Sequence, residues 1–115
     1  MEIKIIKNKI SLAEVKELAL NNYGDMVKAV VDIEQKITAI GGEFHADAEK
    51  LLLENGSRQE DLWGINIYPD KKSAEFIEYN SLINIRPKAG NRKIDIEIPE
   101  IREKIKNIIN EIIQL

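Results

Sequence analysis

Residues 27–40 read Val27-Lys-Ala-Val-Val-Asp-Ile-Glu-Gln-Lys-Ile-Thr-Ala-Ile40, and the architecture depends on how this stretch folds. Its apolar residues fit a strand at 27–33, but they also fit a helix with spacings of four and three. Val and Ile have restricted χ1 rotamers and suit strands better, and the polar residues 34–36 are typical of a turn. We therefore predict a hairpin with strands near 27–33 and 37–40.

The segments around this hairpin predict further strands and helices in a mixed order. Ser11-Leu12-Ala13-Glu14 has the pattern of a capping box, which begins a helix, and Pro99 suits the first position of a last one. The expected strands are 3–6, 27–33, 37–40, 62–68, 74–86 and 94–98, and the expected helices begin near residues 11, 46 and 99. The order β-α-β-β-α-β-β-β-α predicts an α+β fold of two layers, with helices packed on a mainly antiparallel sheet.

Composition limits the class of protein. The chain has 115 residues, of which 43% are hydrophobic and 32% charged, which predicts a single globular domain over residues 1–115. It has no cysteine, so disulfides and thiol chemistry are excluded. The net charge of −3 argues against nonspecific binding of nucleic acid. No apolar run reaches the ~20 residues of a membrane span and no signal peptide is evident, so we expect a soluble, cytoplasmic protein.

The densest polar cluster surrounds the only histidine, His45. Glu43 and Asp47 lie two residues away on either side, and Gly41-Gly42 precedes them. A histidine beside carboxylates can act as a general base or, with hard oxygen ligands, contribute weakly to a Mg²⁺ or Mn²⁺ site, although we predict no metal centre. The alternative is structural: Asp47 or a neighbour caps the following helix, and His45 packs at its start.

A basic turn at residues 86–93 is the second candidate. Arg86, Asn91 and Arg92 belong to it, and guanidinium groups with turn amides can bind an anion. The alternative is a solvated hairpin whose charges protect a sheet edge. Asn84, a polar residue within an otherwise apolar strand, either faces solvent or joins the same ligand site. Standard nucleotide loops and serine-nucleophile motifs are absent from the sequence.

Four runs of this sequence, read in order, resemble a family of small prokaryotic proteins of unknown function. These runs are Val31–Glu34, Gly41–Glu49, Gly56–Gly64 and Ser81–Pro87 with Gly90–Arg92. The resemblance covers nearly the whole chain and implies a shared fold that includes the hairpin at 27–40, but it implies no activity or cofactor. The polar positions that carry it are Asp32, Glu43, His45, Asp47, Glu49, Ser57, Gln59, Asp61, Asn84, Arg86, Asn91 and Arg92. The turn at residues 87–90 departs from the Gln- and Asn-rich turn of that family.

Three functional hypotheses follow. The first is a binding or assembly protein without catalysis, forming a homodimer through the isoleucine ridge of residues 101–115, unless that ridge only covers the sheet. The second is a small enzyme or anionic-ligand site in which His45, Asp47 and Glu43 meet Arg86 and Arg92. The third and weakest is nucleic-acid binding through the turn at 86–93, which has no evident aromatic platform.

Overall fold

The hairpin predicted at 27–40 forms the centre of the sheet. In a computed structural model, which describes residues 2–114, β3 (Val27–Asp32) pairs antiparallel with β4 (Ile37–Gly41). The Asp32 carboxylate closes the turn between them, because it accepts hydrogen bonds from the backbone N–H groups of Glu34 (3.0 Å) and Gln35 (2.9 Å). The hairpin is therefore confirmed, and the helical alternative is wrong.

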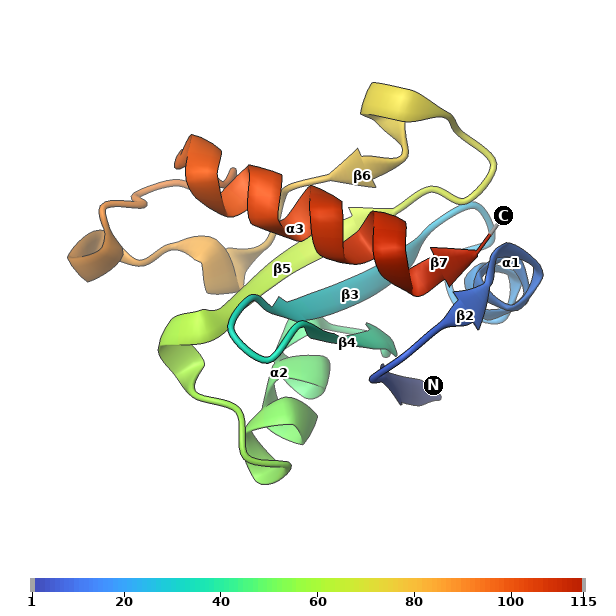
Figure 1. The fold of residues 1–115 in the computed structure, drawn as a ribbon, viewed down its shortest axis with the longest axis horizontal. Helices are drawn as coiled ribbons and strands as arrows, with labels where there is room; N and C mark the ends of the chain where they lie inside the picture. The colour runs from blue at the N-terminus through green and yellow to red at the C-terminus, as the bar shows by residue number, and fades with distance from the viewer. Residues whose placement is uncertain (1, 115) are drawn as a thin grey trace.

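The sheet has five strands in the order β1-β4-β3-β5-β6, and every neighbouring pair is antiparallel. Its other members are β1 (Ile3–Ile6), β5 (Leu62–Ile67) and β6 (Ile77–Glu78). A separate parallel pair, β2 (Ile10–Ser11) with β7 (Ile113–Gln114), was not predicted. Because β7 follows the last helix directly, this short pair ties the two ends of the chain together (Figure 1).

Residues 2–114 contain three α-helices, and each begins close to where the sequence predicts it. They are α1 (Leu12–Leu20), α2 (His45–Glu54) and α3 (Pro99–Ile112). The Ser11 hydroxyl caps α1 by accepting a hydrogen bond from the Glu14 N–H (3.1 Å). The described part of the chain also has four 3₁₀ turns: η1 (Gln59–Asp61), η2 (Ser73–Glu75), η3 (Leu82–Asn84) and η4 (Pro87–Ala89). Within residues 2–114, no helix has the length and apolar character needed to cross a membrane.

Helices cover both faces of the sheet. The larger core cluster joins residues of α1 and α3, such as Val15 and Ile109, to Ala29 and Trp63 on one face. The smaller cluster joins Leu52 of α2 and its neighbours to the other face, and Figure 1 shows α3 crossing in front of the sheet with α2 behind it. The α+β class and the mainly antiparallel sheet are confirmed. The layers number three, not the predicted two, because β3 alternates apolar residues toward both faces.

The strand predicted at 74–86 is wrong over most of its length, because only Ile77–Glu78 joins the sheet. Beyond Glu78, the amide side chain of Asn84 forms the hydrogen bonds to β5 that the backbone of a neighbouring strand would otherwise form. Its Oδ1 accepts from the N–H of Gly64 (2.8 Å), and its Nδ2 donates to the Gly64 carbonyl (2.9 Å). The edge of β5 is thereby satisfied without another strand.

The strand predicted at 94–98 is also wrong as a sheet strand, although its apolar residues alternate with period two. Only Asp95 forms a bridge, an isolated one with Asn80. Side chains occupy the neighbouring carbonyls: Asn84 Nδ2 donates to Ile94 (3.1 Å), and Asn91 Nδ2 donates to Asp95 (3.0 Å). The Ile94 carbonyl also accepts from the Ser81 N–H (3.1 Å), and the Ile96 N–H donates to the Tyr79 carbonyl (3.0 Å), so the backbone pairing of this segment is limited to the single bridge at Asp95.

Candidate functional site

The histidine cluster starts α2. Asp47 accepts a hydrogen bond from the Phe44 N–H through Oδ2 (3.3 Å), and the Asp47 N–H donates to the Phe44 carbonyl (3.0 Å). Asp47 therefore caps the helix. Glu43 is exposed, and its carbonyl accepts from the Tyr23 hydroxyl (2.5 Å). These contacts match the structural alternative given above for the cluster, in which Asp47 or a neighbour caps the helix.

The His45 imidazole is 8% exposed and lies against β5. Its Nε2 is 2.7 Å from the carbonyl oxygen of Ile65, which can only accept, so Nε2 carries the proton. Burial lowers the pKa of His45 below its ordinary value, and the charge of Lys28 acts in the same direction; the hydrogen bond to Ile65 opposes both. A neutral ring therefore anchors the first turn of α2 to the sheet at neutral pH.

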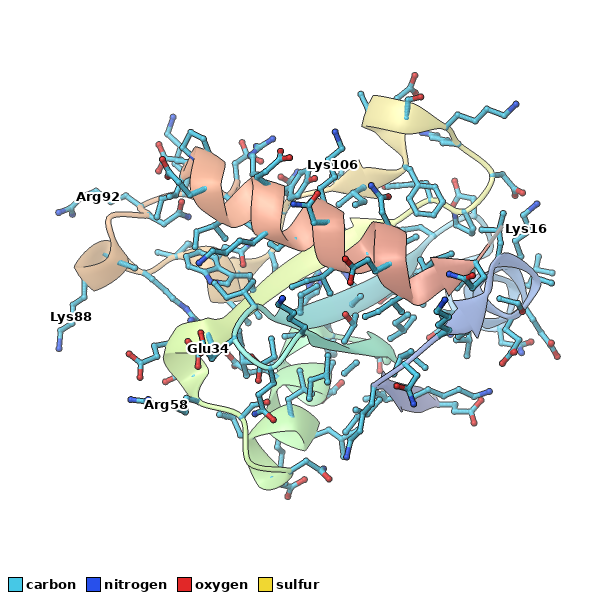
Figure 2. The ribbon with its side chains drawn as sticks, in the orientation of Figure 1. Lys16, Glu34, Arg58, Lys88, Arg92 and Lys106 are labelled. Atoms are coloured by element: carbon cyan, nitrogen blue, oxygen red, sulfur yellow. The ribbon has the colours of Figure 1, made fainter. Side chains whose placement is uncertain are left out.

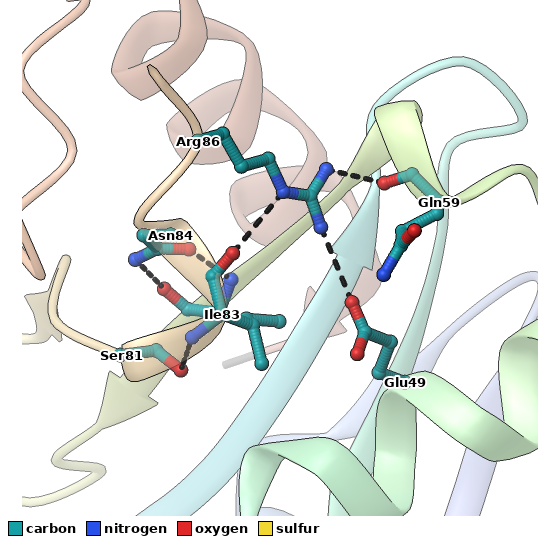
Figure 3. A network of polar contacts seen from close by, with 7 residues as sticks. Glu49, Gln59, Ser81, Ile83, Asn84 and Arg86 are labelled. Carbon is teal, nitrogen blue, oxygen red and sulfur yellow. Dashed lines mark hydrogen bonds and ion pairs between the residues drawn. The ribbon is translucent and has the colours of Figure 1, made fainter. Parts of the chain in front are cut away.

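All three nitrogen atoms of the Arg86 guanidinium contact protein oxygen atoms, as Figure 3 shows. Its Nε donates to the Ile83 carbonyl (3.1 Å), its Nη1 donates to the Gln59 carbonyl, and its Nη2 pairs with Glu49 Oε2 (3.2 Å). The guanidinium also lies 5.2 Å from the centre of the Trp63 ring. Burial lowers the pKa of Arg86, and the Glu49 carboxylate opposes that shift. Arg86 thus links α2, η1 and η3.

The two asparagines predicted as ligand-binding residues are fully buried. Asn84 completes the edge of β5, as described above. The amide nitrogen of Asn91 donates to the carbonyl of Asn84 (2.8 Å), and Asn91 Oδ1 accepts from the Glu97 N–H (2.6 Å). Together with the backbone pair Arg86–Asn91, these contacts hold the irregular segment 80–98 in shape. Arg92 is exposed, and its side chain points away from this network at one end of the molecule (Figure 2).

The structure therefore brings Asn84, Arg86 and Asn91 together but places His45 elsewhere. His45 lines a cavity of about 360 Å³ whose lining includes neither Arg86 nor Arg92. Among residues 2–114, no group of three or more histidine and carboxylate side chains is arranged to hold a metal ion.

A larger groove, of about 950 Å³, lies between α3 and residues 69–79, and we name it the α3 groove. Its apolar lining comes from α1, β6 and its flanks, α3 and β7, namely Leu12, Phe76, Ile77, Tyr79, Ile109 and Ile113. Its charged lining consists of Lys16, Lys71, Lys72, Arg102 and Lys106 with Asp70 and Glu103. Five cations against two carboxylates give a local excess of three positive charges, whereas the whole chain carries −3.

Arg102 is the most constrained cation of the α3 groove. Its Nε donates to the Ile96 carbonyl (2.5 Å), and its guanidinium lies 4.7 Å from the centre of the Tyr79 ring. Burial raises the pKa of Tyr79, and the Arg102 charge opposes that shift. At the opposite side, Lys16 Nζ of α1 pairs with Asp70 Oδ1 at 3.3 Å.

Sequence reasoning missed the α3 groove because three distant segments build it. The available signal was small: Arg102 and Lys106 stand four apart on one face of α3, and Lys71-Lys72 follows a proline turn. Neither pattern predicts that these cations share a surface. Figure 2 shows Lys16 at the end of the molecule opposite Lys88 and Arg92, so the α3 groove and the basic turn are separate.

A comparison with protein-family models matches residues 4–112 to a family described as "Protein of unknown function (DUF5674)". No curated protein and no solved structure matches the chain.

Proposed function

The chain belongs to the DUF5674 family of proteins of unknown function, and we propose that it is a non-catalytic binding protein whose site is the α3 groove. The family resemblance predicted from the sequence is thus confirmed. The ligand that fits this groove is an anion attached to an apolar body, because the lining combines a cationic set of side chains with an apolar surface.

The observation that carries this proposal is the way Arg102 is held. Its Nε donates a hydrogen bond to the Ile96 carbonyl, and its guanidinium group lies near the Tyr79 ring. No residue among 2–114 forms a hydrogen bond or an ion pair with either Nη atom. A guanidinium fixed through Nε offers its two Nη donors as a fork, the geometry that matches a carboxylate or a phosphate. Ordering this side chain in advance lowers the entropic cost of binding.

The remaining cations add charge rather than geometry. Lys71, Lys72 and Lys106 are exposed side chains at the lining of the α3 groove. A lysine ammonium is a mobile point charge, so these residues attract an anion without fixing its orientation. The apolar lining then supplies the contact area that a free inorganic anion would not use.

The test uses 8-anilinonaphthalene-1-sulfonate, a fluorescent aromatic anion, against N-phenyl-1-naphthylamine, the same ring system without the sulfonate. We expect saturable fluorescence enhancement and a raised melting temperature with the anion, weakened by salt, and much weaker binding of the neutral analogue. Equal binding of the two dyes, or no saturable binding of either, would contradict the proposal.

The other predicted functions have less support. A catalytic site that joins His45 to Arg86 and Arg92 would need to free the Arg86 guanidinium from Glu49, Gln59 and Ile83. Nucleic-acid binding still rests only on the exposed cations of the turn at 86–93. A cytoplasmic location remains a prediction, supported by the absence of cysteine.

A further inference from the structure

The outer edge of β6, the last strand of the sheet, has backbone groups without a partner. The Tyr68 N–H donates to the Phe76 carbonyl (2.9 Å), which therefore faces β5, while the Tyr79 carbonyl accepts from the Ile96 N–H (3.0 Å) on the opposite side. Backbone groups alternate in direction along an antiparallel strand, so the N–H and the carbonyl of Ile77 point away from β5. Among residues 2–114, no group on that side forms a hydrogen bond with them. Ile77 therefore offers one donor and one acceptor at a free edge.

This free edge adjoins the α3 groove, because Ile77 is one of its lining residues. Further along the same edge the chain itself occupies the position, since the Ile96 N–H donates to the Tyr79 carbonyl. Arg102 stands at this boundary, because its Nε donates to the carbonyl of the same Ile96. The Nη donors of Arg102 therefore lie near the point where the free edge ends.

We propose that the α3 groove binds the carboxyl-terminal segment of a partner polypeptide as an added strand beside β6. This inference rests on the proposed function and names the ligand class of that site. The backbone of the peptide accepts a hydrogen bond from the Ile77 N–H and donates one to the Ile77 carbonyl. Its terminal carboxylate binds the two Nη atoms of Arg102, and its apolar side chains contact the apolar lining, which includes Phe76 and Ile109.

A chain end fits this place better than an internal acidic segment. A strand that pairs with Ile77 and continues toward Tyr79 meets Ile96, which already occupies the edge. A chain that ends before Tyr79 avoids this obstacle, whereas an internal segment must turn away from the sheet. An amino terminus at this position would bring a positive charge to Arg102 and Lys106, and a carboxyl terminus brings a negative one. The peptide therefore runs parallel to β6.

The dimensions of the groove suit a short extended peptide. Its lining residues on α3 run from Arg102 to Asn110, roughly 12 Å along the helix axis. An extended chain advances ~3.3 Å per residue, so about four residues lie along this wall. A nucleic-acid strand would also meet the cations, but its backbone has no N–H groups to pair with the Ile77 carbonyl. The free edge therefore favours a polypeptide.

Fluorescence anisotropy tests the terminal carboxylate. The probe is a peptide of about six residues, labelled with fluorescein at its amino end, that alternates glutamate with valine and ends in valine. We expect saturable binding of the free acid, and binding about ten- to a hundredfold weaker for the same peptide with a carboxyl-terminal amide. Arg102→Gln should bind the two peptides alike. The matched control Lys104→Gln, at an exposed position of α3 outside the groove lining, should keep the preference for the free acid.

N-methylation of the peptide tests the added strand. Only alternate N–H groups of a strand face its neighbour, so we compare one peptide N-methylated at its valines with one N-methylated at its glutamates. One of the two should bind at least about fivefold more weakly than the parent peptide, and the other should bind nearly as well. Equal affinities of the two methylated peptides would overturn the pairing with β6.

The dye experiment distinguishes failure of this inference from failure of the proposed function. Saturable binding of 8-anilinonaphthalene-1-sulfonate without binding of the free-acid peptide would overturn the peptide inference alone. Equal affinities for the free acid and the amide would do the same. A fluorescein-labelled oligouridylate that binds as tightly as the free-acid peptide would also overturn it, because general charge attraction would then explain the binding. Failure of both the dye and the peptide would overturn the proposed function itself.

Discussion

Nη2 of Arg86 lies 3.2 Å from Oε2 of Glu49, a residue 37 positions earlier in the chain, and each side chain is 14% exposed. This ion pair joins η3 and its flank to α2, over the Trp63 ring of β5. It crosses the boundary between the regular sheet and the irregular segment 80–98. The pair therefore has a structural role that a solvated surface pair would not have.

Glu49→Gln should destabilise the protein by about 1–3 kcal/mol, because it leaves a largely buried guanidinium without its counter-charge. Urea denaturation of the two proteins measures the difference. The control is Glu60→Gln, which breaks the exposed Arg58–Glu60 pair, with side chains 76% and 65% exposed, and should change stability by less than about 0.5 kcal/mol. Equal effects of the two substitutions would show that the Glu49 contact is no stronger than a surface pair.

Asn84→Ala should be more damaging, at about 2–4 kcal/mol, because the N–H and the carbonyl of Gly64 both lose their partner in a buried place. The loss should appear as a lower urea midpoint with little change in slope. Asn107→Ala on the exposed face of α3 is the matched control and should be nearly neutral. A mild effect at Asn84 would mean that water or the backbone replaces the amide.

The same asparagine shows where sequence interpretation of the fold stops. The hairpin at 27–40 was predictable because its alternation and its turn are local. The ends of the strands predicted at 74–86 and 94–98 were not predictable. They depend on which group forms hydrogen bonds with the N–H and the carbonyl of Gly64 on the edge of β5. That group is a side chain 20 residues from Gly64, and no local pattern distinguishes it from a surface asparagine.

The candidate sites divide in a similar way. Several polar positions that carry the family resemblance form internal contacts, such as Ser57 with Asp32 (2.6 Å) and Arg86 with Glu49. These polar residues of the family resemblance therefore stabilise the fold through internal hydrogen bonds and ion pairs. The α3 groove was unpredictable because its cations are ordinary lysines and arginines. They form one cationic surface only when α1, α3 and the 69–79 segment pack together.

The pH dependence of stability should contain a contribution from His45. Its folded-state pKa is lowered, mainly by burial, so below the ordinary value of 6.5 the unfolded chain binds a proton before the folded one does. The contribution is fully present above pH 6.5 and is lost as the pH falls toward the folded-state pKa. Urea denaturation between pH 7.5 and 5 should show the wild type losing more stability than His45→Gln. Parallel curves would contradict this account.

Arg102→Gln should weaken 8-anilinonaphthalene-1-sulfonate binding by about ten- to a hundredfold, since a forked, charge-assisted contact contributes about 1.5–3 kcal/mol. Fluorescence titration gives the dissociation constants. Lys104→Gln removes one positive charge from the same helix at an exposed position that does not line the α3 groove, so it should bind nearly as well as wild type. If both variants weaken alike, general charge attraction rather than Arg102 holds the anion.

Asp70 should act as an internal competitor for the anion. Its Oδ1 lies 3.3 Å from Lys16 Nζ, and both residues line the α3 groove, so a bound anion meets a cation that is already paired. Asp70→Asn removes that competing charge and should tighten binding about two- to fivefold, the range expected for an exposed ion pair. Glu75→Gln, on the same loop but not on the groove lining, is the matched control and should leave the affinity unchanged. The neutral dye should respond to neither substitution, because the effect is electrostatic. An unchanged or weaker affinity of Asp70→Asn for the anion would mean that Lys16 does not contact the ligand, even if the rest of the groove binds it.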